Sequence, residues 1–138
     1  MDKVAVLVDS RGGHTRKIAG AIAEELGAVV GDITRPLPDA EICFLGSGMY
    51  GTGPGLLMNR LLREGDFAGR KVALFATASY PGDGEKMLNS MARALETKGA
   101  TVLGNTDHRG KVILIPYRNP HPEDLEQARQ WAREIAGK

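Results

Sequence analysis

The pattern of apolar residues predicts a doubly wound α/β fold, in which a five-stranded parallel sheet lies between two layers of helices. Short continuous aliphatic runs alternate with segments whose apolar residues recur every three or four positions, and glycine-rich turns separate them. Right-handed crossovers then place helices on both faces, which gives three layers. A chain of 138 residues suffices for one core, and we expect a single domain spanning residues 1–138.

The first half of the chain alternates strand and helix. Residues 4–8 form the continuous aliphatic run that is typical of a buried parallel strand. Helical spacing over residues 18–26 predicts a helix, and Gly27 is placed to end it. A short second strand is expected at residues 29–33, and residues 42–45 are expected to form the third, buried strand.

The middle of the chain predicts two helices and the strand between them. Helical spacing over residues 54–64 indicates a helix that Gly65 closes, and residues 72–75 are expected to form the fourth strand. Apolar residues at helical spacing over residues 88–95 mark the inward face of the next helix, which Gly99 ends.

The last part predicts the sheet edge and a final helix. Residues 101–103 and 112–115 are both strand-like, so this edge either forms a hairpin or carries an interruption at residues 105–110. Pro122 at a first helical position opens the last helix. Its buried face is expected to be Leu125, Ala128, Trp131, Ala132 and Ile135.

Composition excludes several functional classes. The net charge is only +1 and Lys and Arg form no cluster, which argues against nucleic-acid binding. The longest apolar runs are far shorter than the roughly 20 residues of a membrane helix, and the N-terminus lacks the organisation of a signal peptide. We expect a cytoplasmic protein that binds neither nucleic acid nor membrane. Cys43, the single cysteine, lies in an apolar run and is expected to be a reduced core residue.

Ligands of such folds bind outside the carboxyl ends of the strands, where the strand order reverses. The first loop there, residues 10–16, suits an anion, because glycines let backbone amides turn inward and a helix N-terminus adds partial positive charge. The alternative is that Ser10 or Thr15 merely caps the helix. The residues predicted to hold a phosphate are Ser10, Arg11, Gly12, Gly13, His14 and Thr15.

The second loop, residues 46–54, is rich in glycine, so a flat ligand could approach its backbone. Gly46, Gly48 and Gly51 fit the dinucleotide pattern G-x-G-x-x-G, but the pattern follows the third strand, and no acid stands at the end of the next strand for a ribose. The remaining alternative is that Tyr50 packs as a local lid. The candidate residues are Ser47, Gly48, Met49, Tyr50 and Gly51.

The third loop, residues 77–84, places another aromatic residue in a polar setting before a helix. Asp83 has the alternative role of capping that helix. Tyr50 and Tyr80 stand on neighbouring loops, so the two rings could sandwich a planar group. The candidate residues are Thr77, Ala78, Ser79, Tyr80 and Gly82.

Over nearly the whole chain these loops resemble the flavodoxin family. Ser10, Gly13 and Thr15 match the family's T/S-x-T-G-x-T phosphate signature, whereas Gly12 replaces a threonine. The second loop is similar to the family's second flavin loop, where an aromatic residue stacks on the isoalloxazine ring and the next glycine permits a peptide flip; Tyr50 and Gly51 take those places.

Tyr80 falls where the family often has its other stacking aromatic. The resemblance implies the strand order 2-1-3-4-5, bound FMN and electron transfer between a redox protein donor and acceptor, in a monomer or weak homodimer without a metal site. Alternatives on the same fold are an FMN-dependent quinone or porphyrinogen oxidoreductase and a flavin-free interaction module. A phosphate-accepting receiver domain would need an aspartate at the end of the third strand, where this chain has Gly46 and Ser47.

Charge near the ring bears on its reduction potential. Arg11 and Arg16 flank the expected phosphate, while the flavin loops contain only Asp83. Because cations favour the reduced, anionic ring, we expect a milder second-electron potential than in acidic flavodoxins.

Overall fold

The computed structural model describes residues 2–9, 13–33, 37–50, 53–78, 81–103, 112–116 and 122–137. Side chains are not described for residues 2–3, 49–50, 53, 78, 81–85 and 112–116. The elements are β1 (Asp2–Asp9), α1 (His14–Leu26), β2 (Val30–Asp32), β3 (Ala40–Tyr50), β4 (Gly53–Pro54), α2 (Leu56–Glu64), β5 (Lys71–Ala78), α3 (Pro81–Thr97), β6 (Thr101–Val102), β7 (Val112–Pro116) and α4 (Pro122–Ala136).

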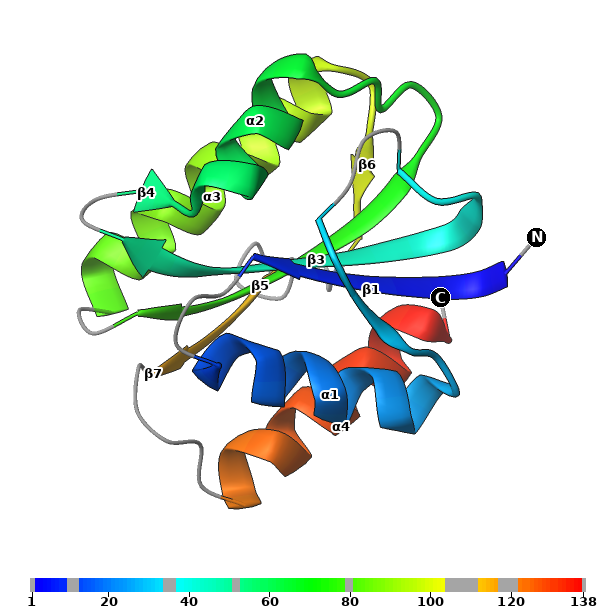
Figure 1. Ribbon diagram of the computed structural model, residues 1–138, viewed down its shortest axis with the longest axis vertical. Coiled ribbons are helices and arrows are strands. Elements are labelled where there is room, and N and C mark those ends of the chain that lie inside the picture. The colour runs from blue at the N-terminus through cyan, green and yellow to red at the C-terminus, as the bar shows by residue number, and fades with distance from the viewer. Residues whose placement is uncertain are drawn as a thin grey trace.

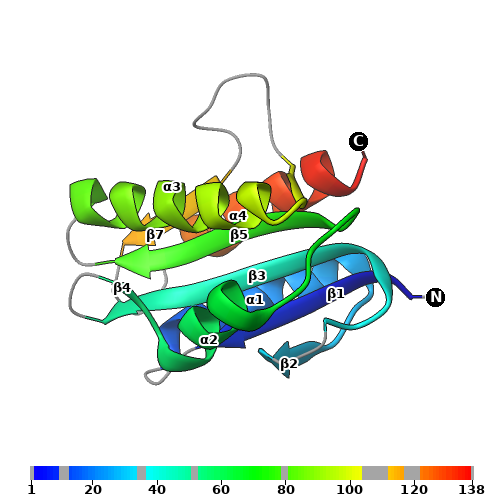
Figure 2. The same ribbon diagram turned by 90° about the horizontal axis from the view of Figure 1, so that it is seen from above.

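The sheet has five parallel strand positions in the predicted order. β2 pairs with β1, β1 with β3, and β3 with β5, all in parallel (Figure 2). β6 and β7 both pair in parallel with β5, at successive points along it: Val102 lies opposite Val72, and Val112 lies opposite Leu74. They therefore occupy the fifth position in turn, and the edge is interrupted rather than folded into a hairpin. β4 adds a short antiparallel pairing to the end of β3.

Helices cover both faces of the sheet (Figure 1). α2 and α3 lie on one face, and α1 and α4 lie on the other. Alternate strand residues point to opposite faces, so Leu45 joins the core under α2 and α3 while its neighbour Phe44 joins the core against α1 and α4. Burial on both faces explains why the strands appear in the sequence as continuous apolar runs.

The core against α1 and α4 is centred on Trp131 of α4. Its ring contacts the ring of Phe44 at a centroid distance of 5.5 Å and that of Phe75 at 6.5 Å, both edge to face. Aromatic pairs in this geometry stabilise the folded state by more than the burial of their apolar area alone. The predicted buried face of α4 is confirmed at Ala128, Trp131, Ala132 and Ile135, whereas Leu125 is only partly buried.

The predicted helix ends are confirmed. Gly27 ends α1 at φ 69°, and Gly99 follows α3 at φ 95°. Side chains other than glycine seldom adopt these left-handed conformations. Several boundaries differ from prediction. Among them, α2 begins at Leu56, and β2 begins at Val30, because Val29 is 87% exposed and lies outside the pairing.

Within the described ranges, no helix is long and apolar enough to cross a membrane. The same residues hold no group of three or more His, Cys, Asp or Glu side chains that could bind a metal ion.

Candidate functional site

The carboxyl ends of β1, β3, β5 and β7 lie along one edge of the sheet, at the left in Figure 1, where α1 also begins. The three predicted loops leave from this edge, so the topology brings their ends together. The structure describes both backbone and side chain for six of the predicted site residues: Gly13, His14, Thr15, Ser47, Gly48 and Thr77. Backbone alone is described for Met49, Tyr50, Ala78 and Gly82. Outside the described residues are Ser10, Arg11, Gly12, Gly51, Ser79 and Tyr80.

The first loop enters α1 through Gly13, which has a φ of 84° in the left-handed region. A Cβ placed on Gly13 would have no heavy atom within 4 Å, so the glycine serves the backbone conformation rather than close packing. The first turn of α1 carries no acidic residue. The positive end of this helix therefore keeps its attraction for an external anion.

The guanidinium of Arg16 in α1 is directed to Asp32 of β2. Its Nη2 atom lies 2.5 Å from Oδ1 of Asp32, and both side chains are largely exposed, at 44% and 68%. Asp32 thus offsets part of the positive charge that the sequence places beside the predicted phosphate site. An exposed pair of this kind contributes little to stability.

A buried hydrogen bond joins the first and third loops. The hydroxyl oxygens of Thr15 in α1 and Thr77 in β5 lie 2.7 Å apart, and the two residues are 1% and 0% exposed. A hydroxyl both donates and accepts, so each side chain retains capacity toward a further polar group. The alternative role of Thr15 as a simple helix cap is not observed, because the N-cap position of α1 is Gly13.

The second loop is shorter than predicted, because β3 continues through Tyr50 and pairs with β4. Gly46, Ser47 and Gly48 belong to the strand and lie opposite residues 75–77 of β5. At Gly46 a Cβ would lie 2.1 Å from the ring of Phe75. This glycine is therefore explained by core packing, and only residues 51–52 lie between β3 and β4 in the chain.

The third loop is also shorter than predicted. Thr77 and Ala78 end β5, and α3 begins at Pro81, so Gly82 and Asp83 lie in the first turn of the helix. Proline is tolerated there because the first-turn N–H groups have no partner within the helix. Only residues 79–80 remain between strand and helix.

Asp9, the last residue of β1, is a carboxylate at this edge that is absent from the predicted site. It is 8% exposed, and its Oδ2 atom accepts a hydrogen bond from the backbone N–H of Met58 in α2 at 2.9 Å. The hydroxyl of Ser47, which lies opposite Asp9 in the sheet, accepts one from the N–H of Gly55 at 2.9 Å and donates to the carbonyl of Gly48 at 2.7 Å. The only sequence signal for Asp9 is an acid that ends an aliphatic run.

Buried polar side chains are concentrated at this edge. Among the residues described, five polar or charged side chains are buried, and four of them lie at the carboxyl ends of β1, β3 and β5 or in the first turn of α1. They are Asp9, Thr15, Ser47 and Thr77, and the fifth is Asp124. Polar groups are expensive to bury, so their grouping here marks a place built for polar contacts.

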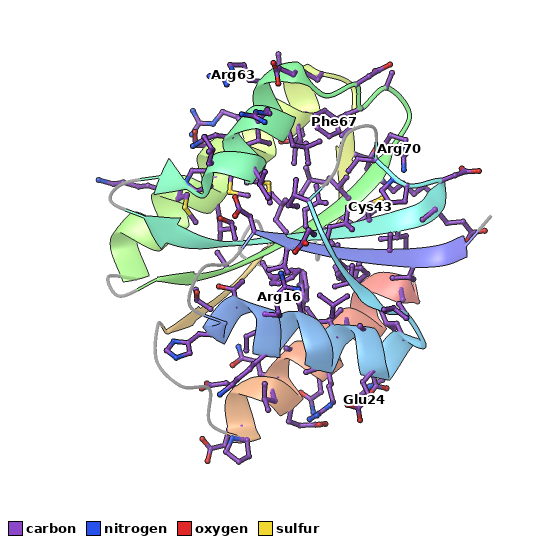
Figure 3. All side chains as sticks on the ribbon, viewed as in Figure 1. Arg16, Glu24, Cys43, Arg63, Phe67 and Arg70 are labelled. Carbon is purple, nitrogen blue, oxygen red and sulfur yellow. The ribbon has the colours of Figure 1, made fainter. Side chains whose placement is uncertain are left out.

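Cys43 lies at the other end of β3, toward the amino edge of the sheet (Figure 3). It is a buried free cysteine, as predicted. Burial raises the pKa of the Cys43 thiol, and the guanidinium of Arg70, whose Nη2 atom lies 3.4 Å from the sulfur, opposes that rise. The same guanidinium donates to the carbonyl of Pro38. This thiol is remote from the candidate site.

Comparison with known proteins supports the fold. No protein-family model matches the chain. An uncharacterized protein of Methanocaldococcus jannaschii is 25% identical over 134 residues, which cover 88% of this chain and 89% of that protein. A flavodoxin from the domain Archaea superposes with a TM-score of 0.79 at 20% identity, covering 98% of this chain and 96% of that one. Oxidised flavodoxin 1 from Bacillus cereus gives 0.76 at 21% identity, covering 99% and 98%.

Proposed function

We propose, from the flavodoxin-like fold of this chain, that it binds FMN at the carboxyl edge of the sheet and carries electrons between a redox protein donor and acceptor. The observation that carries the proposal is the gathering of four buried polar side chains at the edge where α1 begins without an acidic first turn. This edge is also where ligands bind in doubly wound folds.

The donor set at the edge suits a phosphorylated, planar group. Backbone amides at the start of α1, preceded by the left-handed Gly13, favour a phosphate. The hydroxyl of Thr15 stands in the same turn and is held in place by Thr77. FMN, when bound, would supply the one- and two-electron chemistry, and the protein would supply binding and orientation.

The second and third loops would hold the ring. Tyr50 ends β3 and residue 80 directly precedes α3, so the two tyrosines leave from adjacent strands, β3 and β5. Their rings would cover the flavin faces and exclude water. The peptide at Gly51 would accept a hydrogen bond from the ring nitrogen that is protonated on reduction.

Titration of the purified apoprotein with FMN tests the proposal. We expect one FMN per chain, a shifted absorbance spectrum and quenched flavin fluorescence. Free FMN spectra at every ratio would contradict flavin binding. Turnover of a quinone by the FMN-loaded protein with a nicotinamide donor would instead assign it to the substrate-converting oxidoreductases.

Gly13→Ala and Gly27→Ala form a matched pair of variants for the same titration. Both glycines have left-handed φ angles, at opposite ends of α1, so both substitutions impose a similar backbone penalty. We expect Gly13→Ala to weaken FMN binding about tenfold, the factor that about 1.4 kcal/mol produces. Gly27→Ala should reduce stability but leave FMN affinity unchanged. Equal affinities for the two variants would contradict a phosphate site at Gly13.

A further inference from the structure

The N-terminus of α2 is capped by side chains from two strands of the sheet. Its N-cap residue is Gly55, which has no side chain to bond the first-turn amides. The carboxylate of Asp9 accepts from the N–H of Met58, the bond that a capping Asp or Ser usually accepts from within its own helix. The hydroxyl of Ser47 accepts from the N–H of Gly55 itself.

Asp9 also explains why residue 55 is glycine. A Cβ on Gly55 would lie 2.2 Å from Oδ2 of Asp9, far inside the contact distance of non-bonded atoms, so the buried carboxylate would have to move. Gly55 has φ −65° and ψ 168°, an extended conformation that any residue adopts. The carboxylate, and not the backbone conformation, therefore excludes a side chain at this position.

The contact joins the bases of two loops. Asp9 is the last residue of β1 and immediately precedes the first loop. Gly55 immediately follows β4, the strand that pairs with the end of β3 in the second loop. Asp9 and Ser47 lie opposite each other in adjacent strands, so both anchors come from the rigid sheet.

We propose that Asp9 is a positioning residue that fixes the second loop relative to the first, and thereby sets FMN affinity and the first-electron potential. This inference rests on the proposed function. Asp9 acts through α2: its carboxylate is directed to the amide of Met58 and is almost fully buried. When the start of α2 is held, β4 immediately before it is held relative to the end of β1, where the first loop begins. Preorganisation of this kind lowers the cost of binding.

The first test is a double-substitution cycle on the apoprotein. Gly55→Ala alone should destabilise the fold, because its Cβ meets the carboxylate of Asp9. In an Asp9→Ala background the clash is absent, so Gly55→Ala should cost much less. Hydrogen exchange at the Met58 amide should accelerate about tenfold in Asp9→Ala, the scale of losing one helix cap. Additive effects of the two substitutions would overturn the contact on which the proposal depends.

The second test compares FMN binding and potential in Asp9→Ala with those in Ile22→Val. Ile22 is a buried residue of α1 in the core against α4, so its substitution lowers stability without touching the carboxyl edge. We expect Asp9→Ala to lose about tenfold in FMN affinity and to shift the first-electron potential, whereas Ile22→Val changes neither. Asp9→Asn keeps an acceptor oxygen and should restore most of the affinity. If Asp9→Ala does not fold, Gly55→Ala takes its place, because its Cβ displaces the carboxylate from Met58 and should lower the affinity in the same way.

The outcomes separate the two proposals. If the unsubstituted protein does not bind FMN, both the proposed function and this inference are overturned. If it binds FMN and Asp9→Ala binds with unchanged affinity and potential despite faster exchange at Met58, Asp9 is a helix cap only and this inference alone fails.

Discussion

Gly46 shows how a missing Cβ shapes the core beneath the site. A Cβ at this position would collide with the ring of Phe75. That ring is 0% exposed and packs against Trp131, so it has no space into which to move. We expect Gly46→Ala to lower the free energy of unfolding by about 1–3 kcal/mol, the cost of overpacking a tight core. Urea unfolding followed by the fluorescence of Trp131, the single tryptophan, measures it.

Gly20→Ala is the matched control for that substitution. Gly20 lies inside α1, and a Cβ there would have no heavy atom within 4 Å. Because glycine disfavours a helix interior, Gly20→Ala should raise the free energy of unfolding by roughly 0.5–1 kcal/mol. Similar losses in both variants would contradict the close packing of Gly46 on Phe75.

Individual residues differ in how far the sequence predicts them. Thr15 and Ser47 are foreseeable, because hydroxyls beside glycines after a strand are typical of ligand loops. Asp9 is not, because its partner Met58 lies 49 positions away and the contact exists only after β1 and α2 are placed. The neighbouring glycines assign Gly46 to a ligand-binding loop, whereas its role depends on Phe75 in another strand.

The helix α1 is joined to the strand β5 by the hydrogen bond between the hydroxyls of Thr15 and Thr77. Thr15→Val or Thr77→Val leaves the other hydroxyl buried without its partner. Either substitution should lower the free energy of unfolding by about 1–3 kcal/mol. The double substitution removes both hydroxyls and should cost clearly less than the sum of the single ones. Unfolding of the apoproteins in urea gives the coupling energy, and strict additivity would show that the two groups act independently.

Element types follow well from the sequence, and element ends do not. The apolar runs mark β1, β3 and β5, but their polar or small last residues hide where pairing stops, so β3 extends to Tyr50 and β5 to Ala78. α3 starts at Pro81 because its first turn tolerates the proline and glycines that resemble a loop. The choice between a hairpin and an interrupted edge depends on which strand pairs with β5, which is a tertiary fact.

For the whole molecule, the buried thiol of Cys43 predicts how stability depends on pH. Its pKa is raised above the ordinary 9.0 mainly by burial, so the folded protein keeps a proton that the unfolded chain releases. Stability is therefore insensitive to this thiol below pH 9.0 and falls as the pH rises from there toward the folded pKa.

Cys43→Ala isolates that contribution. We expect unfolding free energies of the two proteins to run in parallel below pH 9.0 and to diverge above it, with the steeper loss in the protein that carries the thiol. Chemical denaturation across this range measures the difference. Curves that stay parallel through alkaline pH would show that the thiol titrates alike in both states.

The three-layer arrangement and the strand order are predictable because they depend on repeated, redundant signals along the chain. The charge distribution at the site is less so. Arg16 is paired with Asp32, and Asp9 adds a buried carboxylate near the first loop. For the FMN site proposed above, the charges that would act on the second-electron potential therefore include two acids, Asp32 and Asp9, which the expectation of a milder potential did not count.

The division of the fifth strand into β6 and β7 gives the chain a place where its length is free to vary. The pairing with β5 advances only from Val72 to Leu74, while the chain advances from Val102 to Val112. Each doubling of a connecting segment costs only about 0.6 kcal/mol. A graft inserted between residues 104 and 111, such as a recognition peptide or a reporter, would leave both pairings with β5 in register and would tether its cargo to an otherwise unaltered sheet.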